Sequence, residues 1–190
     1  MRARRWEWAA ALAAVILSFG LVPAPAGLFA AILSGLAVFI AAVDLDRLVI
    51  PDLANAAVLA LGLVLVLLEA DSGGRWLALA DALLRAAVAG GAFLLLRHLY
   101  AQIRGVVGLG LGDVKLAAAG APWLSWPMLP LAVAMAAMAA ILALLVRSLL
   151  RGEHLDRRLE LPFGAFLAPA LWLAFVLDRT DAVARLPWLP

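Results

Sequence analysis

The chain has 190 residues, of which 67% are apolar and only 15% are charged. A soluble domain carries about 25% charged residues, so this chain has too little polar surface to cover a water-soluble particle. The formal net charge is +2, and the basic residues are scattered at the ends of apolar segments, which argues against binding to nucleic acid. Cysteine is absent, which excludes disulfides, thiolate metal sites and cysteine nucleophiles.

Long uncharged runs predict membrane-spanning helices, for example residues 9–22, 28–43 and 122–146. A helix crosses the bilayer core with about 20 apolar residues, and lipid offers no partner for an unpaired backbone. The sequence therefore predicts an all-α, polytopic transmembrane bundle of six to seven helices, with residues 1–190 forming a single domain. The expected spans are residues 8–22, 26–43, 53–69, 82–99, 113–124, 127–147 and 161–178.

Two of these segments leave alternatives open. The span at 113–124 is short and opens with a charged pair, so it is either a half-helix or part of a kinked unit that continues through Trp126 and Pro127. Residues 76–85 contain two charges, which places part of that stretch at the membrane interface. Between the second and third spans we expect a short polar loop over residues 44–52.

The distribution of basic residues predicts the orientation, because cytoplasmic loops are enriched in Lys and Arg. With seven spans and a cytoplasmic amino terminus, the opposite side holds Arg75, Arg179 and Arg185, and nearly all of the other basic residues are cytoplasmic. We therefore expect a multi-pass protein of the cytoplasmic (inner) membrane. Asp44 and Asp113 are then both on the cytoplasmic side.

Asp44 ends an uncharged helix, at a depth where a carboxylate is costly unless it is hydrated, paired or protonated. Pro51 follows and favours the start of a new helix. Proline has no backbone N–H, and the first residues of a helix do not need one for the hydrogen bonds within the helix. Taken alone, this segment is equally consistent with a solvated loop that carries a few acids.

A glycine-rich segment precedes the second acid of interest, Asp113, which begins an apolar helix after Gly108, Gly110 and Gly112. Glycine allows another backbone to come close, whereas an Asp at a helix start also has a plain structural use as a cap. The segment does not fit a phosphate-binding loop, because no Gly-Lys-Ser/Thr ending follows.

Two predicted spans separate Asp44 from Asp113, so both acids reach the same membrane face. Two carboxylates brought together share one proton, because both do not ionise cheaply at contact distance. The neutral acid then protonates and the ionised one activates water, and the sequence does not assign these roles. A multi-histidine metal site is not expected, since His98 and His154 are the only histidines.

These residues resemble the motifs of the type IV prepilin peptidases. The first family motif is an Asp, six residues, then Pro followed by Asn or Asp, and here it is Asp44, Pro51 and Asp52. The second is Gly-x-Gly-Asp-x-Lys-Leu, which here spans residues 110–116. A third likeness is Leu-Pro-Phe-Gly-Ala-Phe at residues 161–166. The resemblance covers about residues 28–178.

The resemblance implies that Asp44 and Asp113 are the catalytic pair. Asp46 competes for the first role, but its spacing to Pro51 does not match the motif. Supporting roles follow for the rest of both motifs. Gly110 and Gly112 permit close approach of substrate or of the first-motif loop, Pro51 is structural, and Asp52 belongs to the solvated loop. Lys115 either holds a negative group of substrate or lipid, or simply reaches the interface as a long side chain.

The implied activity is that of an aspartic endopeptidase that removes the amino-terminal leader of a prepilin or pilin-like protein, in type IV pilus assembly or protein secretion, without metal or cofactor. Long family members also carry a cysteine-containing domain linked to methylation, so methyltransferase activity is not expected here. The alternative is a non-enzymatic transporter or scaffold with structural acids. Presenilin-like proteases pair the Gly-x-Gly-Asp motif with Tyr-Asp, whereas Tyr100 precedes Ala101. The substrate, the cleavage site, the oligomeric state and whether the acids meet without substrate stay open.

Overall fold

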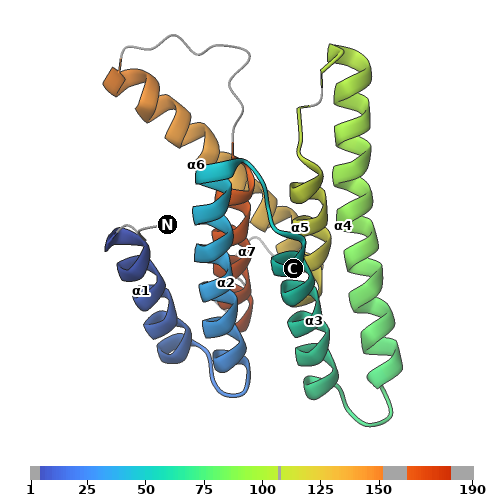
Figure 1. Cartoon of the computed structure of the whole chain (residues 1–190). Coiled ribbons are helices and arrows are strands. Elements are labelled where there is room, and N and C mark those ends of the chain that lie inside the picture. Colours follow the sequence, from blue (N-terminus) through green and yellow to red (C-terminus); the bar gives the residue numbers. More distant parts are fainter. Residues whose placement is uncertain (1–4, 107, 152–161, 181–190) are drawn as a thin grey trace, which may run out of the picture.

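Seven α-helices and one short 3₁₀ helix make up the part of the chain that the structure, a computed structural model, describes: residues 5–106, 108–151 and 162–180 (Figure 1). This confirms the predicted all-α bundle of six to seven helices. The elements are α1 (Arg5–Leu21), α2 (Ala26–Arg47), α3 (Asp52–Glu69), α4 (Arg75–Arg104), α5 (Leu111–Gly120), η1 (Ala121–Trp123), α6 (Met128–Arg151) and α7 (Gly164–Arg179).

Four of these helices are long and apolar enough to cross a bilayer: α2, α3, α4 and α6. The remaining helices are shorter, and α5 with its 10 residues extends only about 15 Å, half of a bilayer core. Few side chains of α4 and α6 are buried, and their exposed apolar residues include Leu94, Leu95, Leu142 and Leu145. In a membrane, such faces contact lipid.

The helices run alternately up and down, and α7 lies at the centre of their packing (Figure 1). It contacts α2, α5 and α6, while α5 also packs against α3 and α4. Trp123 of η1 joins these layers. Its ring meets Phe175 of α7 edge-on at 5.3 Å between centroids, and its Nε1–H donates to the carbonyl of Val58 in α3 at 2.9 Å. Short α5 is thereby fixed inside the bundle.

Asp44 and Asp113 lie at the same end of the bundle. This end, called here the motif end, holds the last turn of α2 and the first turns of α3, α5 and α7, because the helices alternate in direction (Figure 1). The opposite end holds the junctions of α1 with α2, of α3 with α4, and of η1 with α6.

The polar loop predicted for residues 44–52 is shorter than expected. Helix α2 continues to Arg47 and ends at Leu48 in the left-handed conformation, with φ of 55°. Asp44 is therefore still helical, and only residues 48–51 connect α2 to α3. The charges after Val43 do not end the helix, because a helix that reaches the membrane surface accepts polar residues in its last turn.

Two further boundaries differ from the prediction. The fourth span is one continuous helix, α4, with 30 residues. A helix makes all of its backbone hydrogen bonds internally, so its first turns stay helical at the membrane interface even without an apolar surface. The alternative of a kinked unit through Trp126 and Pro127 is wrong. Helix α5 ends at Gly120, η1 follows, and α6 begins separately at Met128.

Candidate active site

Asp44 is a buried acid at the end of an apolar helix. Its side chain belongs to the last turn of α2, and the residue is only 4% exposed. The turn closes behind it, because the N–H of Leu48 donates to the carbonyl of Asp44 at 2.9 Å. Pro51 then holds the extended conformation that starts α3. The first motif therefore brings a carboxylate into the bundle and turns the chain sharply beyond it.

Asp113 is the third residue of α5 and is 8% exposed. Its Oδ2 accepts a hydrogen bond from the N–H of Gly110 at 3.2 Å, so the acid does contribute to capping its helix. Its Oδ1 is buried and has no hydrogen-bond partner among the described residues. One oxygen is thus structural, while the other is left without a partner.

The loop before Asp113 is fixed by α4. The guanidinium of Arg97 donates to the carbonyl of Leu109, and the ring of Tyr100 packs so closely on Gly108 that an added Cβ would lie 2.4 Å from it. Gly112 meets Ile50 of the first-motif loop, with 3.1 Å between an added Cβ and the Cβ of Ile50. The second motif therefore packs directly against the first.

The two acids line one pocket of about 400 Å³, and their charges interact. The same pocket is lined by residues 48–52 and by residues 110–113 and 115, which include the supporting motif residues. Asp46 does not belong to this lining and is exposed. The geometry therefore favours Asp44 over Asp46 as the partner of Asp113.

The first turn of α7 also reaches the acids. The N–H of Ala165 donates to Oδ2 of Asp44 at 2.8 Å, and the amide of Gly164 interacts with both carboxylates. A Cβ on Gly164 would lie 3.0 Å from Oδ2 of Asp44 and 2.4 Å from Cδ1 of Ile50. Glycine at this position lets the α7 backbone approach the acid directly.

These α7 contacts were not predicted, although the Pro-Phe-Gly element was noticed by resemblance. Leu161 of that element lies outside the described residues. A signal was available, because this element opens the last predicted span, residues 161–178. Counting spans would have placed that start at the motif end. Ile50 packs between Gly112 and Gly164, and nothing in the sequence indicates this contact.

Lys115 forms an ion pair with Asp52 at the mouth of the pocket, with 2.6 Å between Nζ and Oδ1. The pair joins α5 to the start of α3, but both side chains are more than half exposed, so its contribution to stability is small. Within the described residues, no group of three or more His, Asp or Glu side chains gathers that could hold a metal ion.

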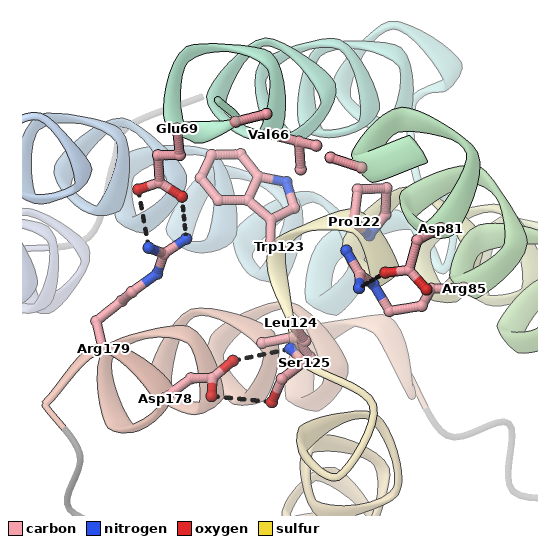
Figure 2. A pocket seen from close by; sticks show the side chains of 12 residues that line it. Val66, Glu69, Asp81, Arg85, Pro122, Trp123, Leu124, Ser125, Asp178 and Arg179 are labelled. Carbon is pink, nitrogen blue, oxygen red and sulfur yellow. Dashed lines mark hydrogen bonds and ion pairs between the residues drawn. The ribbon is translucent and has the colours of Figure 1, made fainter. Parts of the chain in front are cut away.

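A second pocket, of about 460 Å³, lies at the opposite end of the bundle (Figure 2). Its acids have well-placed partners. Glu69 forms a two-fold ion pair with Arg179 at 2.7 and 2.8 Å. Asp178 accepts from the N–H and the hydroxyl of Ser125 at 2.8 and 2.9 Å. Asp81 pairs with Arg85 and accepts from Trp126. These contacts join α3, α4, α7 and the segment after η1.

Known proteins resemble the chain over most of its length. Residues 31–145 match the model of the type IV leader peptidase family. The prepilin leader peptidase/N-methyltransferases of Aeromonas salmonicida and Aeromonas hydrophila are each 33% identical over 182 residues, which is 94% of this chain. Leader peptidase HopD of Escherichia coli is 39% identical over 92 residues, 48% of this chain and 59% of that protein.

The chain spans only 58% and 59% of the length of the two Aeromonas relatives. No solved structure matches it. The family match nevertheless covers more than half of the chain and includes both acid motifs. On these grounds, the chain belongs to the type IV leader peptidase family.

Proposed function

We propose that this protein is an intramembrane aspartyl endopeptidase that removes the amino-terminal leader of a prepilin or pilin-like protein. One observation carries the proposal: two buried acids from distant motifs, Asp44 and Asp113, line the same pocket at one end of an apolar bundle. The names of the relatives, prepilin leader peptidase among them, support the substrate class. We do not extend to this chain the N-methyltransferase activity that the names of these relatives also give.

The chemistry follows from the paired carboxylates. One ionised carboxylate removes a proton from water as the water oxygen attacks the scissile carbonyl, and the protonated partner gives its proton to the carbonyl oxygen. Collapse of the tetrahedral species then transfers a proton to the leaving amine. A pocket that is open to water at the membrane surface supplies the nucleophile, and the low-dielectric surroundings strengthen each electrostatic contact.

We propose that the motif end faces the cytoplasm in the inner membrane. Six described basic residues lie toward this end: Arg47, Arg97, Arg104, Lys115, Arg147 and Arg151. Three lie toward the opposite end: Arg75, Arg85 and Arg179. Positive charge is enriched on cytoplasmic loops, so this distribution supports the orientation. A leader that precedes an apolar helix would then be cut where that helix enters the membrane.

A transporter or scaffold is the competing function. Transport would place charges or broken helices near the bilayer midplane. Asp44 and Asp113 instead lie at one end of their helices, which favours the peptidase.

Leader trimming in membranes tests the proposal. A prepilin-like protein from the same genome is co-expressed with the parent, Asp44→Asn, Asp113→Asn or Asp46→Asn, and its size is followed on gels. Asn keeps the size of the side chain but does not exchange the proton, so we expect no trimming with the first two variants. Asp46→Asn is the matched control from the same motif and should trim as the parent does. Equal trimming by all four proteins would contradict the proposal.

A further inference from the structure

The first turn of α7 gives Asp44 a close backbone donor that Asp113 lacks, the N–H of Ala165. The N–H groups of a first helical turn have no partner within the helix, and the positive end of the helix dipole lies there. Here the N–H of Ala165 donates to Oδ2 of Asp44 at 2.8 Å in buried surroundings and, over a longer 3.2 Å, also to the carbonyl of Pro162 just before the helix. The Gly164 amide adds to the contact with Asp44. Such donors favour a negatively charged carboxylate.

The donors around Asp113 are weaker. Its residue is 8% exposed, and its Oδ1 has no hydrogen-bond partner among the described residues. A buried oxygen that carries negative charge without a donor is costly, whereas the neutral acid avoids most of that cost. The N–H of Gly110 donates to its Oδ2 over a long bond of 3.2 Å, and the Gly164 amide, which Asp113 shares with Asp44, adds to it. A proton shared by the two acids therefore belongs on Asp113.

We propose that the first turn of α7 is a third element of the active site, and that it sets the roles of the two acids. The N–H of Ala165, which reaches Asp44 alone, favours the ionised form of that acid, so Asp44 is the base that activates water and Asp113 is the acid. This inference rests on the proposed function, because it assigns roles within that reaction.

The proton balance closes with these roles. Asp44 takes a proton from water while the new C–O bond forms, and Asp113 gives its proton to the carbonyl oxygen, which yields a neutral tetrahedral diol. As the C–N bond breaks, Asp44 gives its proton to the leaving nitrogen, and Asp113 takes one back from a diol hydroxyl. Both acids return to their starting states. Ala165 touches no reacting atom, so it is a positioning residue.

Replacing one backbone amide tests the positioning role. Lactic acid in place of Ala165, introduced by nonsense suppression, keeps the methyl group but turns the N–H into an ester oxygen. The matched control is the same change at Ala168. Its N–H lies within α7 and points along the helix toward the carbonyl of Gly164, four residues earlier. We expect the Ala165 ester to lower kcat for leader cleavage about 10- to 100-fold, the effect of one hydrogen bond to a charged group.

The expected change lies in kcat and not in KM, because the amide acts on the reacting acid and not on bound leader. The Ala168 ester should lower the unfolding temperature by as much or more, and yet cleave close to the parent rate. If the parent cleaves and both esters cleave alike, α7 does not position Asp44. If the parent itself does not cleave, the proposed function fails instead.

Infrared difference spectra test the proton assignment without any cleavage. The spectrum of the purified parent minus that of Asp113→Asn should contain the band of a protonated carboxyl group. The parent minus Asp44→Asn should contain the bands of an ionised carboxylate. A carboxylate band in the Asp113 difference, in a parent that cleaves the leader, would overturn the assignment and leave the peptidase function intact.

Discussion

Acidic side chains occupy pockets at both ends of the bundle, but the two ends differ in how those acids are partnered. At the opposite end, Glu69 and Asp81 pair with arginines, and Asp178 takes two hydrogen bonds from Ser125 (Figure 2). At the motif end, the described residues give no ion pair to Asp44 or Asp113. These two acids have only backbone donors and each other.

The difference separates stability from chemistry. An acid with a close cation or two good donors stabilises the contacts between helices. Two buried acids without cations interact with each other, and such perturbed pairs are typical of functional sites. The opposite end has one exception, because Nε of Arg85 is buried without a partner among the described residues. The comparison predicts that substitutions at the motif end mainly change activity, and that those at the opposite end mainly change stability.

Apart from replacing the acids themselves, the largest effect is expected where α7 meets Asp44. Gly164→Ala would place a methyl group 2.4 Å from Cδ1 of Ile50 and 3.0 Å from Oδ2 of Asp44. Ile50 is buried between Gly112 and Gly164, so relief requires movement of the site, and a shift of about 1 Å costs roughly 100-fold in rate. We expect leader cleavage to fall by about that factor, measured as initial rates in membranes.

Adding Ile50→Val to Gly164→Ala should restore much of this activity, because valine lacks the Cδ1 atom at the closest contact. The matched control is Gly35→Ala in α2, where an added methyl group meets nothing within 4 Å. That control should cleave at the parent rate. Full activity of Gly164→Ala alone would show that the close approach of α7 is not needed.

A smaller effect, and one of another kind, is expected at the opposite end. Asp178→Ala leaves the N–H and the hydroxyl of Ser125 without their acceptor. Losing the acceptor of partly buried donors costs about 1–3 kcal/mol, so the unfolding temperature in detergent should fall. Cleavage by the folded protein should not change, since the site lies at the other end.

The control for this variant is Asp71→Ala, in the exposed turn between α3 and α4. Exposed substitutions usually change stability by less than about 0.5 kcal/mol. If Asp178→Ala instead abolishes cleavage at a temperature where it remains folded, the two ends are coupled, and the separation of stability from chemistry is wrong.

The sequence predicted the features that side-chain type and spacing encode. Apolar runs gave the helices, and the motif spacing gave Asp44 and Asp113, which the structure brings into one pocket. The end of α2 was misplaced, because hydropathy marks where the apolar surface stops, whereas the helix itself continues to Arg47. A left-handed Leu48 ends it, and leucine gives no sign of such a turn.

Other parts of the site were beyond prediction for a physical reason. The donor to Asp44 is a backbone N–H of Ala165, and every residue except proline has one, so residue type does not mark it. The pair of Glu69 and Arg179 joins residues 110 positions apart, and its formation depends on how α3 and α7 end at the same level. Such contacts follow from packing, which is known only once the helices are placed.

The smallest effect is expected for the ion pair of Lys115 and Asp52, which lies at the motif end but resembles the paired acids of the opposite end. Both side chains are largely exposed, and exposed pairs contribute about 0–1 kcal/mol. Charge removal in Lys115→Met should therefore lower cleavage no more than about five-fold, with a smaller difference at high salt because the pair is screened.

Exchanging the two charges distinguishes a link between helices from a direct contact with substrate. The double variant Asp52→Lys with Lys115→Asp keeps the pair but reverses its direction, so it should recover the rate lost in Lys115→Met if the pair only joins α3 to α5. Initial rates for the two single variants and the double variant, at low and high salt, give the coupling between the positions. If the exchange lowers cleavage more than either single change, Lys115 and Asp52 contact the leader itself. The charged residues that line this pocket would then all take part in the reaction or in binding of the leader, and none would serve stability alone.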